Sequence, residues 1–205
     1  MPGIQFCTKQ VLRTGIVLYG FKLTFQSVID IGGAALLIDL IVVSLTILLG
    51  AGLGRLLKMD RDTALLTSIG SSICGAAAVL GAEPVVKSKP YKAAVAVSTV
   101  VIFGTLSMFL YPALYRAGML NLTTEQMGLF TGATLHEVAH VVGAGNAMGQ
   151  AISDPAIIVK MIRVMMLAPV LVILSIILAR RDSAAGGNSE KRKITIPWFA
   201  FLFLA

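Results

Sequence analysis

Charge is scarce in this sequence. Only 13% of its 205 residues are Asp, Glu, Lys or Arg, whereas 57% are hydrophobic, and the mean hydropathy is +0.88. A soluble domain carries about 25% charged and about 45–50% apolar residues. The apolar residues of this chain stand in long runs, as they do in segments that cross a bilayer. The composition therefore excludes an ordinary soluble domain and predicts an all-α, polytopic bundle of transmembrane helices.

Cysteine is scarce as well, since the chain contains only Cys7 and Cys74. Two cysteines do not make a disulfide framework, and Cys74 stands in an apolar segment where a buried free thiol is expected. The net charge of +7 comes mostly from Lys and Arg between apolar runs, as in cytoplasmic loops of membrane proteins. These basic stretches lack the aromatic residues that stack on bases. The lipid bilayer is therefore an expected partner, and nucleic acid is not.

Long apolar runs divide the chain into consecutive expected segments. They cover residues 10–29, 34–57, 63–86, 93–115, 131–150 and 156–179, and a polar linker at 180–193 precedes a last run from Ile194. That last run, ITIPWFAFLFLA, is about 18 Å long as a helix, which is too short for about 30 Å of hydrocarbon. Residues 1–205 are therefore expected to form one membrane domain that is part of a longer protein.

The segment 63–86 differs from its neighbours because it is rich in glycine, serine and alanine. Glycine and proline are tolerated at membrane depth where protein or a water-filled cavity satisfies the backbone, so a broken helix in the protein interior is expected. Backbone N–H groups at Gly70, Ser71, Ser72 and Gly75 would then cradle an anion beside Cys74. A small-residue seam for helix packing explains the same composition equally well.

The segment 131–150 contains His136, Glu137 and His140 in otherwise apolar surroundings. On a helix the two histidines would lie one turn apart on the same face, and HEVAH fits the HExxH pattern of two zinc ligands and a general base. The third-ligand position of the extended pattern holds Asn146, a poor zinc ligand. Two other interpretations stay open. The histidines either hydrogen-bond inside a packed bundle, or His136 and Glu137 bind substrate or carry a coupled proton.

Three more charged residues stand near segment ends. Asp39 lies early in 34–57, and Lys160 and Arg163 lie early in 156–179. Their positions predict anchors at the membrane interface. In the alternative, Lys160 and Arg163 are ligands that supply the fixed positive charge which sulfate requires.

The distribution of basic residues bears on topology. If every segment crosses the membrane, Lys87, Lys89 and Lys92 lie on the side opposite the basic linker at 180–193. If 63–86 and 131–150 both re-enter, all these residues share the cytoplasmic side, which the positive-inside rule favours.

Several motifs resemble one family in order and nearly from end to end. The stretches GSSICGAAAV, EPVVK, VIFGTL, LYPALY, HEVAHVVGAG, KMIRVMMLAP and KITIPWFA are similar to those of the UPF0324 family, the YeiH-type sulfate exporters. The resemblance implies a longer inner-membrane protein of about ten helices, with inverted repeats and broken helices that cross at the centre. In that family the histidine motif usually reads HEVAQ, so His140 departs from the pattern and the zinc interpretation is weakened.

Together these features predict a multi-pass inner-membrane secondary transporter that exports sulfate or a related small anion, and not an enzyme. Its site is expected between the broken segments 63–86 and 131–150, and no cofactor or metal is expected. The predicted substrate-binding residues are Gly70, Ser71, Ser72, Cys74, Gly75, His136, Glu137, Asn146 and Arg163. The alternatives are an intramembrane zinc hydrolase using HEVAH or an inactive truncated transporter. The sequence leaves open whether the protein forms a homo-oligomer. It also leaves open which substrate is transported, in which direction, and with which coupling ion.

Overall fold

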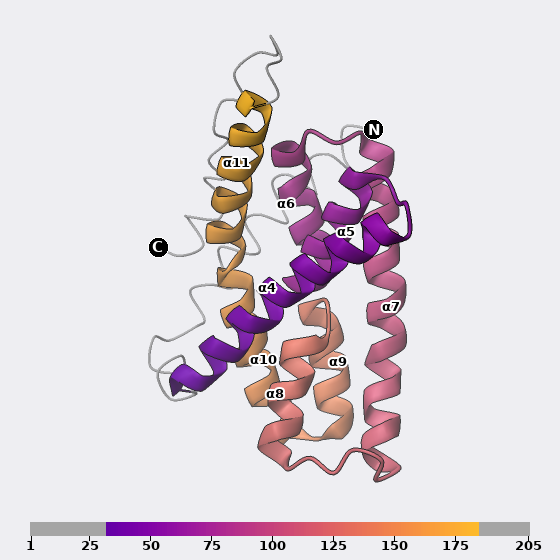
Figure 1. The fold of residues 1–205 in the computed structure, drawn as a ribbon. Helices are drawn as coiled ribbons and strands as arrows, with labels where there is room; N and C mark the ends of the chain where they lie inside the picture. Colours follow the sequence, from indigo (N-terminus) through magenta and orange to yellow (C-terminus); the bar gives the residue numbers. More distant parts are fainter. Residues whose placement is uncertain (1–31, 185–205) are drawn as a thin grey trace, which may run out of the picture.

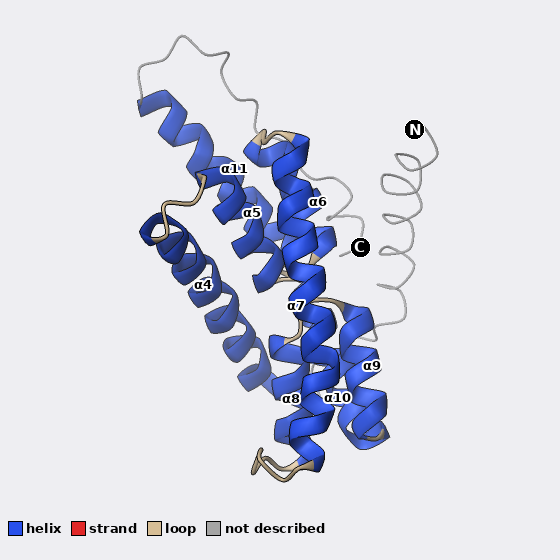
Figure 2. Ribbon diagram, turned by 90° about the vertical axis from the view of Figure 1, so that its right-hand side faces the viewer, coloured by secondary structure: helices blue, strands red, loops and turns tan. Residues whose placement is uncertain are grey.

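The computed structural model describes residues 32–184, in which all regular structure is helical (Figures 1 and 2). The expected segments 10–29 and from Ile194, as well as Cys7, lie outside these residues. The described helices are α4 (Gly32–Leu56), α5 (Arg61–Ser72), α6 (Ala76–Val86), α7 (Pro90–Arg116), α8 (Thr124–Thr134), α9 (Val138–Met148), α10 (Gln150–Met165) and α11 (Leu167–Ala184).

Within residues 32–184, three stretches of helix are long and apolar enough to cross a bilayer. They are Leu37–Leu56, Pro90–Arg116 and Gln150–Arg180, the last made of α10 and α11 in succession. The apolar runs of the sequence predicted all three. Helix α11 continues to Ala184, into the linker predicted at 180–193, and the rest of that linker lies outside the described residues.

Both of the remaining segments are broken in the middle and fold back as hairpins. Helices α5 and α6 occupy the upper half of the molecule, and α8 and α9 occupy the lower half (Figure 1). At the upper end Lys92 Nζ lies 2.7 Å from Oδ2 of both Asp60 and Asp62, so the beginnings of α5 and α7 are adjacent. At the lower end Arg116 Nη2 donates to the Ala147 carbonyl at 2.7 Å. Each hairpin therefore has both of its ends at the same end of the molecule, which is the geometry that the re-entrant alternative expects.

Local signals explain where the hairpin helices begin. The Asp60 side chain accepts a hydrogen bond from Thr63 N at 3.2 Å and caps α5. Thr123 and Gln126 form a reciprocal capping box at the start of α8. Each cap satisfies backbone N–H groups that have no partner inside the helix.

The core lies between the hairpins and the long helices, and apolar side chains cover the outside. Buried residues of α5, α6 and α11, such as Leu66, Val79 and Leu171, form the largest cluster. Large apolar side chains on α4 and α7, including Leu48 and Phe109, remain 70% and 68% exposed. Such surfaces suit a hydrocarbon environment, where exposed apolar side chains carry no penalty.

Candidate functional site

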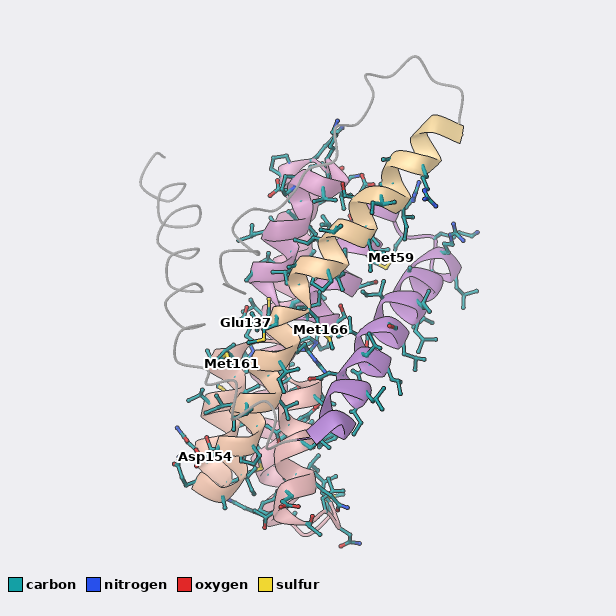
Figure 3. The ribbon with its side chains drawn as sticks, turned by 90° about the vertical axis from the view of Figure 1, so that its left-hand side faces the viewer. Met59, Glu137, Asp154, Met161 and Met166 are labelled. Atoms are coloured by element: carbon teal, nitrogen blue, oxygen red, sulfur yellow. The ribbon has the colours of Figure 1, made fainter. Side chains whose placement is uncertain are left out.

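The tips of the two hairpins meet in the middle of the molecule. The first break consists of Ile73, Cys74 and Gly75, and the second consists of Leu135, His136 and Glu137. In Figure 3 Glu137 lies at mid-height, well above Asp154 near the lower end. The first and second breaks therefore lie far from both ends of the long helices.

Lys160 of α10 joins the two breaks. Its Nζ donates to the Ile73 carbonyl and to the Leu135 carbonyl, both at 2.6 Å, and the residue is completely buried. Ile73 is the C-cap of α5, and Leu135 is the C-cap of α8. Because the carboxyl end of a helix carries partial negative charge, one ammonium group stabilises two helix ends that would otherwise expose unpaired carbonyls.

Glu137 binds the amino end of a helix, whereas Lys160 binds two carboxyl ends. Its Oε1 accepts a hydrogen bond from Ala76 N at 3.2 Å, at the amino end of α6. Gly75, the N-cap of α6, has φ +75°, and a Cβ there would collide with the Glu137 side chain. Glycine is therefore required both for the backbone conformation and for the close approach of the carboxylate.

His140 completes the group around the second break. It lies on α9, where its Nε2 is 3.3 Å from Thr105 Oγ1 and 3.9 Å from Glu137 Oε2. Its ring packs against Gly104 of α7, where a Cβ would overlap the imidazole. The Nδ1 atoms of His136 and His140 are both buried without a hydrogen-bond partner among the described residues.

The helix that the zinc interpretation requires is not present. His136 and Glu137 lie in the second break, so of the three residues that the zinc pattern uses only His140 lies on α9. The two histidines are therefore not stacked one turn apart on a helix. Among the residues that the structure describes, no three His, Cys, Asp or Glu side chains come together to hold a metal ion.

Three charged residues predicted at the interface are buried instead. Arg163 donates through Nε and Nη2 to Asp39 Oδ1 at 3.0 and 2.6 Å, and this pair links α10 to α4. Lys160, Arg163 and Asp39 are at most 1% exposed. The prediction was wrong because α10 begins at Gln150, which places Lys160 roughly 15 Å inside the helix. The Arg163 guanidinium already forms an ion pair with the Asp39 carboxylate. Arg163 therefore lacks the unpaired positive charge that is expected of an anion ligand.

The expected amide cradle at Gly70, Ser71 and Ser72 is also absent. These residues form the last turn of α5, where a helix presents carbonyl groups rather than N–H groups. Ser72 Oγ donates to the Ile69 carbonyl at 2.9 Å, and Gly75 N donates to the Gly70 carbonyl at 2.9 Å. The break follows these residues in the chain, so they end a half-helix instead of beginning one.

The other predicted site residues divide between the breaks and the surface. Cys74 and Gly75 lie in the first break, and the Cys74 thiol is free and buried, as expected. Asn146 is exposed on α9, and it lies roughly 13 Å along the helix axis from Glu137. Its Oδ1 accepts from Ser153 Oγ at 2.8 Å, so Asn146 is not part of the central group.

The sequence did not single out two polar residues near the breaks. Thr105 contacts His140 from α7, and Thr131 on α8 is completely buried with no partner for Oγ1 among the described residues. An isolated threonine in an apolar helix carries no signal of its own. Only its position beside the breaks distinguishes it.

The sequence profile of the family described as "Conserved hypothetical protein 698" matches residues 1–205. The chain belongs to this family, UPF0324. A UPF0324 membrane protein of Bacteroides thetaiotaomicron is 66% identical over 205 residues, which are 100% of this chain and 61% of the relative. The UPF0324 inner membrane protein YeiH of Escherichia coli K12 is 50% identical over 204 residues, which are 98% of this chain and 58% of the relative.

This UPF0324 chain therefore spans about three fifths of the length of the curated relatives it matches. A third relative, from Yersinia pestis, is 50% identical over 208 residues and covers 98% of the chain. No solved structure matches. The family, together with the three long apolar helices, establishes a helical membrane protein.

Proposed function

We propose that this UPF0324 protein is a multi-pass secondary transporter, and not an enzyme, that exports sulfate or a related small anion across the inner membrane. The relative YeiH carries the description of an inner membrane protein, which supports that location. The basic residues of the upper end, such as Lys58, Lys87 and Lys89, favour a cytoplasmic orientation of that end.

The contact of Lys160 with both breaks carries the proposal. Broken helices that meet at mid-membrane are the usual setting of substrate sites in secondary transporters. An ammonium group has three N–H donors, and the carbonyls of Ile73 and Leu135 use two of them. The remaining donor and the positive charge supply an attraction for an anion in surroundings of low dielectric, where charge interactions are strong.

The hairpins also offer a route from each side. The α5–α6 hairpin enters from the upper end and the α8–α9 hairpin from the lower end, and their tips meet at Lys160 (Figure 1). Movement of one hairpin away from α10 exposes the centre to one side only. Alternating movement of this kind transports a bound ion without opening a continuous pore.

Sulfate binding to the purified protein tests the proposal. A ligand present at 100 times its Kd stabilises the folded state by about 2.7 kcal/mol, so sulfate is expected to raise Tm and chloride at equal ionic strength is not. Lys160→Met should lose the shift, whereas Lys89→Met, at an exposed lysine, should keep it. Metal analysis beside His140→Gln tests the enzyme alternative. Stoichiometric zinc that the variant loses would contradict the transporter assignment of this motif.

A further inference from the structure

The amino end of α6 is occupied by a carboxylate from a distant part of the chain. Glu137 Oε1 lies 3.2 Å from Ala76 N, although the two residues are 61 positions apart in the sequence. The N-cap of α6 is Gly75, which has no side chain that caps the helix. The helix end therefore binds an anionic group supplied by the other hairpin, and the positive φ of Gly75 and its missing Cβ leave room for that group.

We propose that Glu137 is the proton-coupling residue of the transporter. Its carboxylate occupies the amino end of α6 when no substrate is bound, and a substrate anion takes that place only after Glu137 has accepted a proton and withdrawn. The inference rests on the proposed function and adds its coupling ion: one proton binds with each anion and leaves with it on the other side.

Electrostatics makes the exchange obligatory. Two negative groups at one half-helix end repel each other strongly where the dielectric constant is low, and the end carries only about half a positive charge. A protonated carboxyl group has no negative charge and gains an O–H donor, so it no longer competes for the Ala76 N–H. His140 Nε2 lies 3.9 Å from Glu137 Oε2, so the imidazole is the nearby polar group on α9, and the tautomer of the ring decides whether Nε2 donates or accepts.

Buried polar atoms near Glu137 are available to a ligand. Lys160, completely buried, uses two of its three N–H donors on the carbonyls of the breaks. Nδ1 of His136 is buried with no partner among the described residues, whereas Nδ1 of His140, also without a partner there, packs against Gly104 of α7. An anion at the end of α6 would lie between the two breaks, both of which Lys160 contacts.

The other titratable groups around Glu137 come from four places, one of which is α9, where His140 Nε2 lies 3.9 Å from Glu137 Oε2. His136 stands beside it in the second break, Cys74 lies in the first break, and Lys160 faces both breaks from α10. Helix α7 contributes the neutral residues Gly104 and Thr105 next to His140. Among these groups, only Glu137 bonds to the end of α6 and changes from anion to neutral group when protonated.

Proton uptake by the wild-type protein tests the coupling directly. In weakly buffered detergent solution, addition of sulfate should take up about one proton per bound anion at pH values where Glu137 is ionised. Over the same range the apparent Kd for sulfate should rise about tenfold per pH unit, as linkage requires. Sulfate binding without proton uptake would overturn the role of Glu137 and leave the proposed function intact. Absence of sulfate binding would overturn both.

Substitution identifies the residue that carries the proton. Glu137→Gln mimics the protonated state, so the apparent Kd should become independent of pH and proteoliposomes should exchange sulfate without moving protons. Glu125→Gln, at an exposed glutamate of α8, should retain wild-type coupling. If Glu137→Gln keeps the wild-type proton uptake, or if His140→Gln alone abolishes it, Glu137 is not the coupling residue.

Discussion

At the scale of single residues, charge inside the membrane is balanced locally. Lys160 neutralises two carboxyl ends of half-helices, Glu137 binds one amino end, and Arg163 pairs with Asp39. A charged residue at the bilayer centre costs about 2.5–3.5 kcal/mol on insertion scales, so each requires a partner that recovers the loss. This balance explains why so apolar a chain retains ionisable groups in its interior.

The Asp39–Arg163 pair should behave as a buried ion pair. Asp39→Leu leaves the Arg163 guanidinium buried without its partner, which should lower the free energy of unfolding by about 3–5 kcal/mol. The double variant Asp39→Leu/Arg163→Met should recover most of that loss because neither charge remains. Thermal unfolding in detergent measures both effects, with Asp154→Asn at an exposed position as the control. A double variant no more stable than Asp39→Leu would argue against the pair.

Gly104 should be required for the position of His140. A methyl group there overlaps the imidazole ring, so Gly104→Ala should displace His140 and lower both Tm and sulfate binding. In Gly52→Ala no atom lies within 4 Å of the new Cβ, and alanine in a helix is favoured over glycine by about 0.5–1 kcal/mol. That variant should be as stable as the wild type or more so. Equal behaviour of the two variants would contradict the packing described for α7 and α9.

At the scale of elements, the sequence predicted that both segments are broken, but it gave a local reason only for the first break. The first break lies in a segment whose Gly and Ser content weakens a helix, and that composition is visible without a structure. The second break interrupts HEVAH, where local propensity favours a helix. It depends on contacts with distant residues: the bond of Glu137 to Ala76 and that of the Leu135 carbonyl to Lys160. Tertiary contacts of this kind leave no local pattern in one sequence.

The re-entrant hairpins make a prediction about membrane sidedness. In a Cys7→Ser background, Lys58→Cys precedes α5 and Lys89→Cys follows α6, so both should react with a membrane-impermeant maleimide from the same side. Asn121→Cys, in the loop between α7 and α8, should react from the opposite side. Labelling of Lys58→Cys and Lys89→Cys from opposite sides would mean that residues 63–86 cross the membrane.

At the scale of the whole molecule, hydropathy and charge predicted the architecture better than the site. The long apolar runs predicted the three stretches of the described residues that are long and apolar enough to cross a bilayer, and the lysine distribution favoured the re-entrant arrangement. The site depended on where each helix begins. Helix α10 starts before the expected boundary at 156. Lys160 therefore lies buried at the centre of the molecule, and not at the interface where the sequence predicted it. Ser71, Ser72 and Asn146 were predicted to donate hydrogen bonds to an anion. In the structure these three residues lie outside the two breaks.

Sulfate counterflow into proteoliposomes is the most direct test of the central claim, that an anion is held beside Lys160 between the two breaks. Vesicles preloaded with sulfate should accumulate external labelled sulfate when they contain the wild-type protein. Lys89→Met should match the wild type, and Lys160→Met should reduce the initial rate at least about tenfold, a loss of about 1.4 kcal/mol in transition-state stabilisation. Wild-type counterflow in a well-folded Lys160→Met protein would contradict the account.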